Sequence, residues 1–146
     1  MFKFYDLADW GDVNFVFQGS TDGGTSYNTT WTTTYFYARH TEDDGTATLA
    51  YLDSADNANG TGYQMISNAL RNDADASLSG ELYLWSPSST TYVTQWYCRT
   101  SMMQSSPGAW ETFAAGFWDT TSAIDAVIFK PSSGTFDGKI KMWGVK

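Results

Sequence analysis

The chain has 146 residues, of which 42% are hydrophobic and 17% aromatic, and its formal net charge at pH 7 is −8. A domain of this length can bury most of its apolar surface without disulfides, and the single cysteine, Cys98, excludes an internal disulfide and is expected to be a small buried hydrophobe. Only eight residues are Lys or Arg, and no apolar run approaches the ~20 residues of a membrane span, so neither nucleic acid nor a membrane is an expected partner.

Turn signals separate short alternating or aromatic runs at a spacing of about ten residues, which is typical of an all-β sandwich or jelly roll. Threonine, glycine and aromatic residues favour strands and turns over helices. In chain order, strands are predicted at 2–6, 12–18, 32–39, 46–52, 62–68, 80–87, 91–100, 109–119, 123–130 and 138–146. Residues 69–77 favour a short helical turn or a loop. We therefore expect one antiparallel β-sandwich (jelly-roll) domain of about ten strands over residues 1–146.

The predicted strand at 12–18 has one clearly apolar face, because alternation places Val13, Phe15 and Phe17 on the same side. The Asp-Gly-Gly sequence at 22–24 follows it and supplies the positive φ angles that a tight turn requires. This strand is therefore expected to bury its aromatic face and then reverse direction.

The predicted strand at 80–87 carries aromatic side chains on the face that should point away from the core. Its alternating faces are Leu82 and Leu84 on one side and Glu81, Tyr83 and Trp85 on the other. A solvated sheet face normally carries Lys, Glu, Thr and Ser. Tyr83 and Trp85 therefore indicate a second buried surface, such as a contact with a neighbouring subunit.

The last predicted strand, 138–146, alternates in the same way. Ile140 and Met142 are expected to seal the core, whereas Lys139, Lys141 and Trp143 should face away from it. Four of the five lysines fall near this end of the chain: Lys130, Lys139, Lys141 and Lys146. Two interpretations remain open: Lys139 and Lys141 contact an acidic surface of a partner or neighbouring subunit, or they give an edge strand the ordinary protection that lysine provides.

Residues that could carry chemistry are sparse. His40 is the only histidine, and it precedes three carboxylates at 42–44, but no G-x-S-x-G elbow or comparable nucleophile motif is present. A solvated polar turn is expected there. Paired carboxylates drawn from Glu81, Glu111 and Asp119 would suit glycoside hydrolysis, although any acidic β-protein offers as much.

The Asp-Gly turns at 21–24 and 42–45 leave a structural calcium as an alternative, but neither has the spacing of an EF-hand, and Asp-Gly is common turn chemistry. We expect a protein that is not an enzyme, with no catalytic residue, no cofactor and no metal ligand. The tryptophans offer a binding function instead. A sugar-stacking platform could use two or three of six residues, the others being needed for packing: Trp10, Trp31, Trp85, Trp96, Trp110 and Trp118.

Three segments resemble a recurrent β-module of tailed-bacteriophage virion proteins. FVFQGSTDGGTSYNTTW (15–31) resembles its early "StDGGs-Y" hairpin, and SGELYLWSPSSTTYV (79–93) resembles its central "GeiyLfsPss-t-y" strand and loop. PSSGTFDGKIKMWGVK (131–146) resembles its closing "S-G-x-h-x-x-G-x-I-x-L-Y-G-h-K" signature, where h is apolar. The matched positions are Asp22, Gly23, Gly24, Tyr27, Gly80, Leu82, Leu84, Pro87, Ser133, Gly134, Gly138, Ile140, Gly144 and Lys146. Met142 stands where the signature has Leu, Trp143 stands for Tyr, and Lys139 is extra.

The resemblance implies a jelly-roll-like sandwich and a role in virion structure, either as a free-standing capsid decoration protein or as a module of head-fibre and tail proteins. It implies no catalytic residues. The closing signature further leads us to expect that Gly134 and Gly138 shape the turn into the last strand and that Gly144 marks a close backbone approach.

We expect a capsid decoration (cement) protein, because the chain shows no stalk or attachment segment, and most simply a homotrimer bound to the major capsid protein on the capsid exterior. The sequence MFKFYDLADW lacks the apolar h-region of a signal peptide, so synthesis in the host cytoplasm is expected. The alternative is a receptor-binding or carbohydrate-binding module of a phage tail or fibre.

Overall fold

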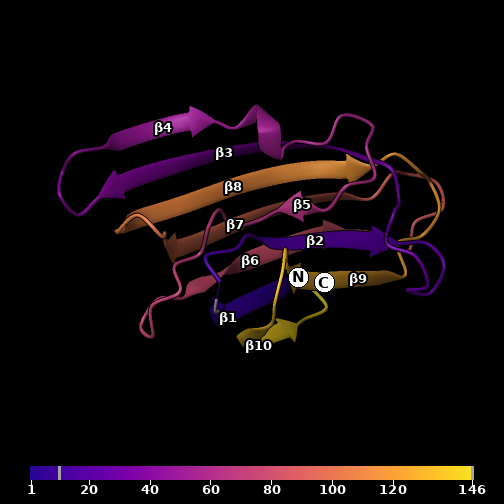
Figure 1. The fold of residues 1–146 in the computed structure, drawn as a ribbon. Coiled ribbons are helices and arrows are strands. Elements are labelled where there is room, and N and C mark those ends of the chain that lie inside the picture. The colour runs from indigo at the N-terminus through magenta and orange to yellow at the C-terminus, as the bar shows by residue number, and fades with distance from the viewer. Residues whose placement is uncertain (10, 146) are drawn as a thin grey trace.

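A computed structural model describes residues 1–9 and 11–145, and it confirms the all-β prediction. Ten strands form two antiparallel sheets, of seven and three strands, which pack against each other as a sandwich (Figure 1). The helical content of these ranges is one 3-10 turn, η1 (Asp53–Ala55), which the sequence did not predict. Residues 69–77 form a loop. Within the described ranges, no helix is both long enough and apolar enough to cross a membrane.

The larger sheet has the strand order β10-β1-β6-β7-β8-β3-β4, and the smaller sheet has the order β5-β2-β9. The strands of the larger sheet are β1 (Phe2–Asp9), β3 (Trp31–Thr41), β4 (Ala47–Tyr51), β6 (Leu78–Trp85), β7 (Gln95–Met103), β8 (Gly108–Trp118) and β10 (Phe136–Met142). Those of the smaller sheet are β2 (Phe15–Ser20), β5 (Gln64–Met65) and β9 (Ala126–Pro131). Each strand overlaps one of the ten predicted runs.

The core lies between the two sheets and is built mainly from aromatic rings. Phe17 of β2 is at its centre, with its ring centroid 4.7 Å from that of Trp96 and 5.2 Å from that of Trp31, both in edge-to-face geometry. The Trp118 ring stacks on Trp31 at 5.3 Å. Such pairs add about 0.5–1.5 kcal/mol each beyond the area that they bury, so this core accounts for part of the aromatic excess of the sequence.

Gln18 is a fully buried polar residue on β2 that joins three segments of the chain. Its side-chain Nε2 donates to the carbonyl oxygens of Thr29, Thr61 and Gly62 at 3.2, 3.3 and 3.2 Å. Its Oε1 accepts a hydrogen bond of 2.9 Å from the indole Nε1 of Trp118. Buried amides need such partners, and here the partners attach two loops to the small sheet.

The Asp-Gly-Gly turn adopts the geometry that its sequence predicts. Gly23 and Gly24 have φ angles of +72° and +83°. The Asp22 carboxylate accepts hydrogen bonds from the Ser26 backbone N–H at 2.9 Å and from the Ser20 hydroxyl at 2.7 Å. These bonds, the backbone bond first, hold the pKa of Asp22 below its ordinary value. The Asp22 carboxylate therefore binds residues of the turn itself and stabilises it.

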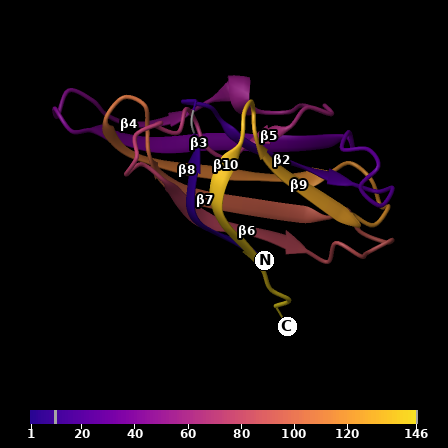
Figure 2. The ribbon, with the colours of Figure 1, turned by 60° about the horizontal axis from the view of Figure 1, so that its bottom comes forward.

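Two expectations for the last strand are wrong. Ile140 packs on the core, but Met142 is 74% exposed, because β10 is the outermost strand of the larger sheet and the chain leaves the sandwich after it (Figure 2). A Cβ at Gly144 would meet no heavy atom within 4 Å, whereas one at Gly138 would lie 2.7 Å from the backbone oxygen of Asp6. The close backbone approach is therefore at Gly138. Lys146 lies outside the described residues.

Candidate functional site

The outer face of the larger sheet, on the side away from the core, is rich in aromatic side chains. Six outward-pointing aromatic residues come from four adjacent strands: Phe36 on β3, Tyr83 and Trp85 on β6, Tyr97 on β7, and Phe113 and Phe117 on β8. A face of this kind is unusual for a sheet that contacts only water. We call it the outer face below.

Tyr83 and Trp85 form one half of this surface together with Tyr97 of the neighbouring strand. The Tyr83 and Tyr97 rings stack at 4.9 Å with an interplanar angle of 8°, and Trp85 lies 5.2 Å from Tyr97. Trp85 is 49% exposed. Alternation correctly predicts that Tyr83 and Trp85 point away from the core, and their role in an interaction stays a prediction. Burial, followed by the nearby Tyr83, raises the pKa of Tyr97, in keeping with a partly dehydrated cluster.

The other half of the outer face lies towards the opposite sheet edge. The Phe36 and Phe113 rings stack at 4.7 Å with an interplanar angle of 6°. Tyr51 of edge strand β4 pairs with Phe36 in register and is 59% exposed, and Leu49 beside it is 74% exposed. In antiparallel sheets, paired residues share a face, so the apolar surface continues to the edge of the sheet.

Charged residues gather at the β10 side of the outer face. Lys3 on β1 pairs in register with Lys141, Tyr5 pairs with Lys139, and the Lys141 ammonium lies 5.5 Å from the centre of the Tyr5 ring. Sequence reasoning identified Lys139 and Lys141 but missed Lys3, because Lys3 joins them only through the pairing of the first and last strands. Glu81 pairs with Lys3 from the β6 side, so this corner holds three lysines and one carboxylate and is cationic on balance, although the whole chain has a net charge of −8.

An open groove of about 480 Å³ crosses the aromatic part of the outer face. Trp85, Tyr97 and Phe117 line it, and the small side chains of Thr34 and Ala115 leave the space between them. Gln95 adds an amide at its end. The groove is therefore shaped for an apolar group and has few polar partners to offer.

Two of the three carboxylates considered for hydrolysis lie close to each other on the outer face, and the third lies apart from them. Glu111 forms an ion pair with the Arg99 guanidinium, and this hydrogen bond raises the pKa of Arg99. Glu81 lies on the other side of Arg99 in the sheet register, and Asp119 follows the end of β8 in an exposed position. Glu81 and Glu111 line one open cavity of about 290 Å³, with Arg99 between them, and Asp119 does not line this cavity.

Two other candidates are placed as the sequence predicts. His40 is exposed, and its Nε2 lies 2.9 Å from the Asp44 carboxylate in the β3–β4 turn. Cys98 is buried on the inner side of β7, and burial raises the pKa of its thiol. Among the described residues, no group of three or more His, Cys, Asp or Glu side chains is arranged to hold a metal ion.

The structure shows which tryptophans remain available for the sugar-stacking platform that the sequence left as an alternative. Four of the six candidates are buried in the core: Trp31, Trp96, Trp110 and Trp118. They point inward because alternation places each of them on the side of its strand that faces the core. Trp85 is exposed on the outer face, and Trp10 lies outside the described residues.

Comparison of the chain with protein-family models, with curated proteins and with solved structures found no match. The resemblance to phage virion modules therefore rests on the three segments quoted from the sequence and stays a prediction.

Proposed function

We propose that the chain is a structural protein of a tailed-bacteriophage virion, a capsid decoration (cement) protein that binds the outside of the assembled major-capsid lattice. The observation that carries this proposal is the outer face, where aromatic side chains extend over four neighbouring strands and Tyr51 and Leu49 continue them to the sheet edge. Aromatic residues supply much of the binding energy of protein interfaces.

The shape and charge of the outer face support docking on a protein surface. Its aromatic part would contact apolar side chains of the shell, and the corner with Lys3, Lys139 and Lys141 would contact acidic ones. Binding as a homotrimer at local three-fold positions would repeat this contact by symmetry. The resemblance of three segments to modules of phage virion proteins supports the same role in virion structure.

The proposed mechanism is thermodynamic linkage, without catalysis. A protein that binds the expanded shell more tightly than the free capsid subunits stabilises the shell by mass action, by about 2.7 kcal/mol per site at a free concentration of 100 Kd. The net charge of −8 would keep free copies apart in the host cytoplasm until they bind. In the virion, the protein would lie on the capsid exterior.

The outer face can be tested with Trp85→Ser and Phe113→Ser. Each substitution removes an aromatic ring from the outer face without touching the core, and we expect each to weaken binding to shells of the major capsid protein about 30-fold, as for a hot-spot residue worth ~2 kcal/mol. The measurement is co-sedimentation of the purified protein with expanded shells that lack decoration.

Tyr92→Ser is the matched control, because Tyr92 is exposed but lies in the β6–β7 loop and not on the outer face. It should bind shells like the wild type. Shell binding that is unchanged in both outer-face variants would contradict the proposed docking surface, and a copy number in virions that matches the tail and not the capsid lattice would contradict decoration.

The groove beside Trp85 supports a second candidate, a receptor-binding or carbohydrate-binding module of a tail or fibre. Trp85, Tyr97 and Phe117 could receive the apolar face of a sugar ring. This candidate predicts binding to host cells that Trp85→Ala abolishes, together with no binding to capsid shells.

A further inference from the structure

A second cavity lies on the opposite layer of the sandwich, away from the outer face. It has a volume of about 490 Å³ and opens beside β5, the start of β2 and the turn η1. Val16 of β2 pairs in register with Met65 of β5, so both side chains lie on the outward side of the smaller sheet and form an apolar floor. This volume falls within the ~300–1,000 Å³ typical of small-molecule sites.

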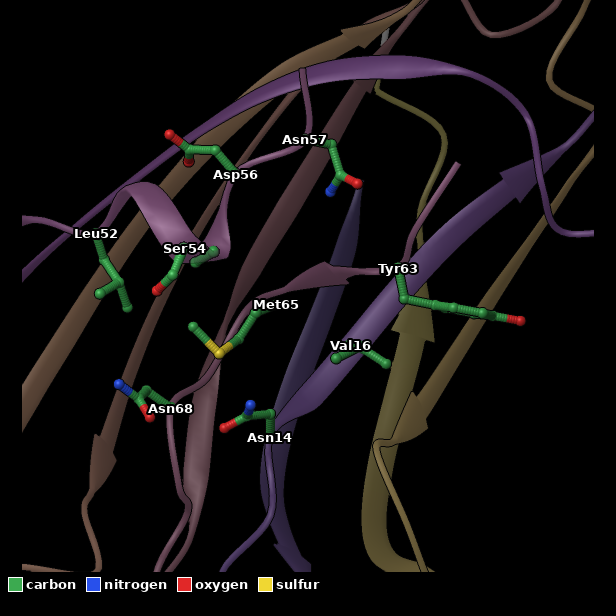
Figure 3. A pocket seen from close by; sticks show the side chains of 10 residues that line it. Asn14, Val16, Leu52, Ser54, Asp56, Asn57, Tyr63, Met65 and Asn68 are labelled. Atoms are coloured by element: carbon green, nitrogen blue, oxygen red, sulfur yellow. The ribbon is translucent and has the colours of Figure 1, made fainter. Parts of the chain in front are cut away.

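The walls of this cavity are made of uncharged hydrogen-bonding groups. Figure 3 shows Met65 near the centre, Ser54 and Leu52 on one side, and Asn14 and Asn68 on the other. Asn57 adds a third amide from the segment after η1. We call the cavity the amide pocket, defined by Asn14, Val16, Ser54, Asn57, Met65 and Asn68.

Hydrogen bonding within the described part of the chain leaves some of these polar groups unused, although the Asn57 Nδ2 donates to Gln64 Oε1 at 3.5 Å. Among the described residues, the Asn68 amide and the Ser54 hydroxyl make no side-chain hydrogen bond. Asn14 uses its Oδ1 to accept from the Ala69 backbone N–H at 2.8 Å, which fixes the side chain and leaves its Nδ2 available. Unpaired amides and hydroxyls that surround one apolar floor are a binding surface for a ligand that both donates and accepts hydrogen bonds.

The amide pocket is held in shape before any ligand binds. The buried Gln64 donates from Nε2 to the carbonyl oxygens of Ala55 in η1, at 3.1 Å, and of Met65 in β5, at 3.0 Å. Asn57 exchanges two hydrogen bonds with Thr33, of 2.8 and 2.9 Å. The wall and the floor are therefore tied together, which lowers the ordering cost of binding.

The charged residues around the amide pocket limit the kind of ligand that it can bind. The one carboxylate on the rim, Asp56, is hydrogen-bonded to the Tyr51 hydroxyl, and burial raises its pKa. Lys130 pairs in register with Val16 of the floor, and its ammonium lies 4.2 Å from the centre of the ring of Tyr63, which also lines the cavity. One carboxylate and one ammonium therefore stand beside the amide pocket, and neither sign of charge dominates, which favours an uncharged ligand.

We propose that the amide pocket binds an uncharged hexose unit of a glycan. The hydroxyl groups of a sugar both donate and accept, as the Asn and Ser side chains require, and the C–H face of the ring matches the floor of Val16 and Met65. This site is separate from the outer face, so it would add glycan binding to a protein whose other surface docks on a shell.

The test uses the whole chain with glucose, galactose, mannose and N-acetylglucosamine, and with short oligomers of each, measured by saturation-transfer NMR and calorimetry. Asn68→Leu and Ser54→Ala remove groups that make no hydrogen bond in the fold, so both variants should stay folded. We expect binding of at least one sugar, weakened about tenfold by each substitution, which is the effect of one lost hydrogen bond.

Trp85→Ala is the matched control, because it alters the groove of the outer face and leaves the amide pocket intact. It should bind the same sugar with unchanged affinity. The proposal is overturned if none of the sugars binds, or if Trp85→Ala abolishes binding that Asn68→Leu leaves unchanged. Shell binding is measured separately and depends on the outer face. A failure of sugar binding therefore counts against the amide pocket alone, and a failure of shell binding counts against the decoration proposal alone.

Discussion

Replacing Gln18 by Met is expected to lower the free energy of unfolding by about 3–5 kcal/mol, although the side chain keeps nearly the same length. The substitution removes the hydrogen bonds that the fully buried Gln18 side chain makes with the Trp118 indole N–H, the Gly19 backbone N–H and the carbonyl oxygens of Thr29 and Thr61. The Gly62 oxygen keeps its hydrogen bond from the Trp31 indole N–H. Each buried group left without a hydrogen bond costs about 1–3 kcal/mol. Water can reach the loop carbonyl oxygens in part, so the expected loss of stability is smaller than the sum of the separate costs.

Gln95→Met is the matched control for this prediction. Gln95 is an exposed residue on the outer side of β7, and its side chain makes no hydrogen bond among the described residues, so the same chemical change should alter stability by less than about 0.5 kcal/mol. Urea unfolding followed by tryptophan fluorescence measures both variants. Equal stability of the two variants would show that the Gln18 network contributes nothing net to the fold.

Gln18 also marks the limit of what alternation can predict. The pattern around Phe15 and Phe17 puts Gln18 on the opposite face of its strand, where a polar residue ordinarily meets water. In the structure the loops at Thr29 and at Thr61–Gly62 cover that face, and every residue of β2 is buried. Loop packing depends on contacts between distant segments, which a local pattern does not contain.

The strands themselves were predictable because their signal is local. In β7 the inner residues Trp96, Cys98 and Thr100 are all buried, and the side chains between them face outward, as period-two alternation requires. The same rule places Tyr83 and Trp85 on the outer face. The turn η1 has no comparable signal, since three residues are too few to show a helical period.

The two candidate sites differ in how much of each was predictable. Half of the outer face follows from alternation in single strands, but the meeting of Lys3 with Lys141 requires the pairing of β1 with β10. The amide pocket was not predictable, because Asn14, Asn57 and Asn68 come from three separate loops that share no motif in the sequence. Only the three-dimensional arrangement gives them a common environment.

Gly138→Ala is expected to destabilise the protein by about 2–4 kcal/mol, measured by urea unfolding. Gly138 has φ = +128°, a backbone conformation that residues with a Cβ rarely adopt. A Cβ there would also lie 2.7 Å from the Asp6 backbone oxygen and 2.8 Å from the Leu7 Cα. Backbone atoms cannot move aside as a flexible side chain can, so β10 would have to separate locally from β1, where the register already shifts between Tyr5 and Ala8.

Gly144→Ala provides the comparison, because it makes the same change in the same closing segment but meets no atom within 4 Å. It should change stability by less than about 0.5 kcal/mol. A loss in Gly144→Ala as large as that in Gly138→Ala would contradict this account of the closing segment. The expected difference has a further consequence: because β10 carries Lys139 and Lys141, Gly138→Ala should weaken shell binding as well as folding, whereas Gly144→Ala should leave both unchanged.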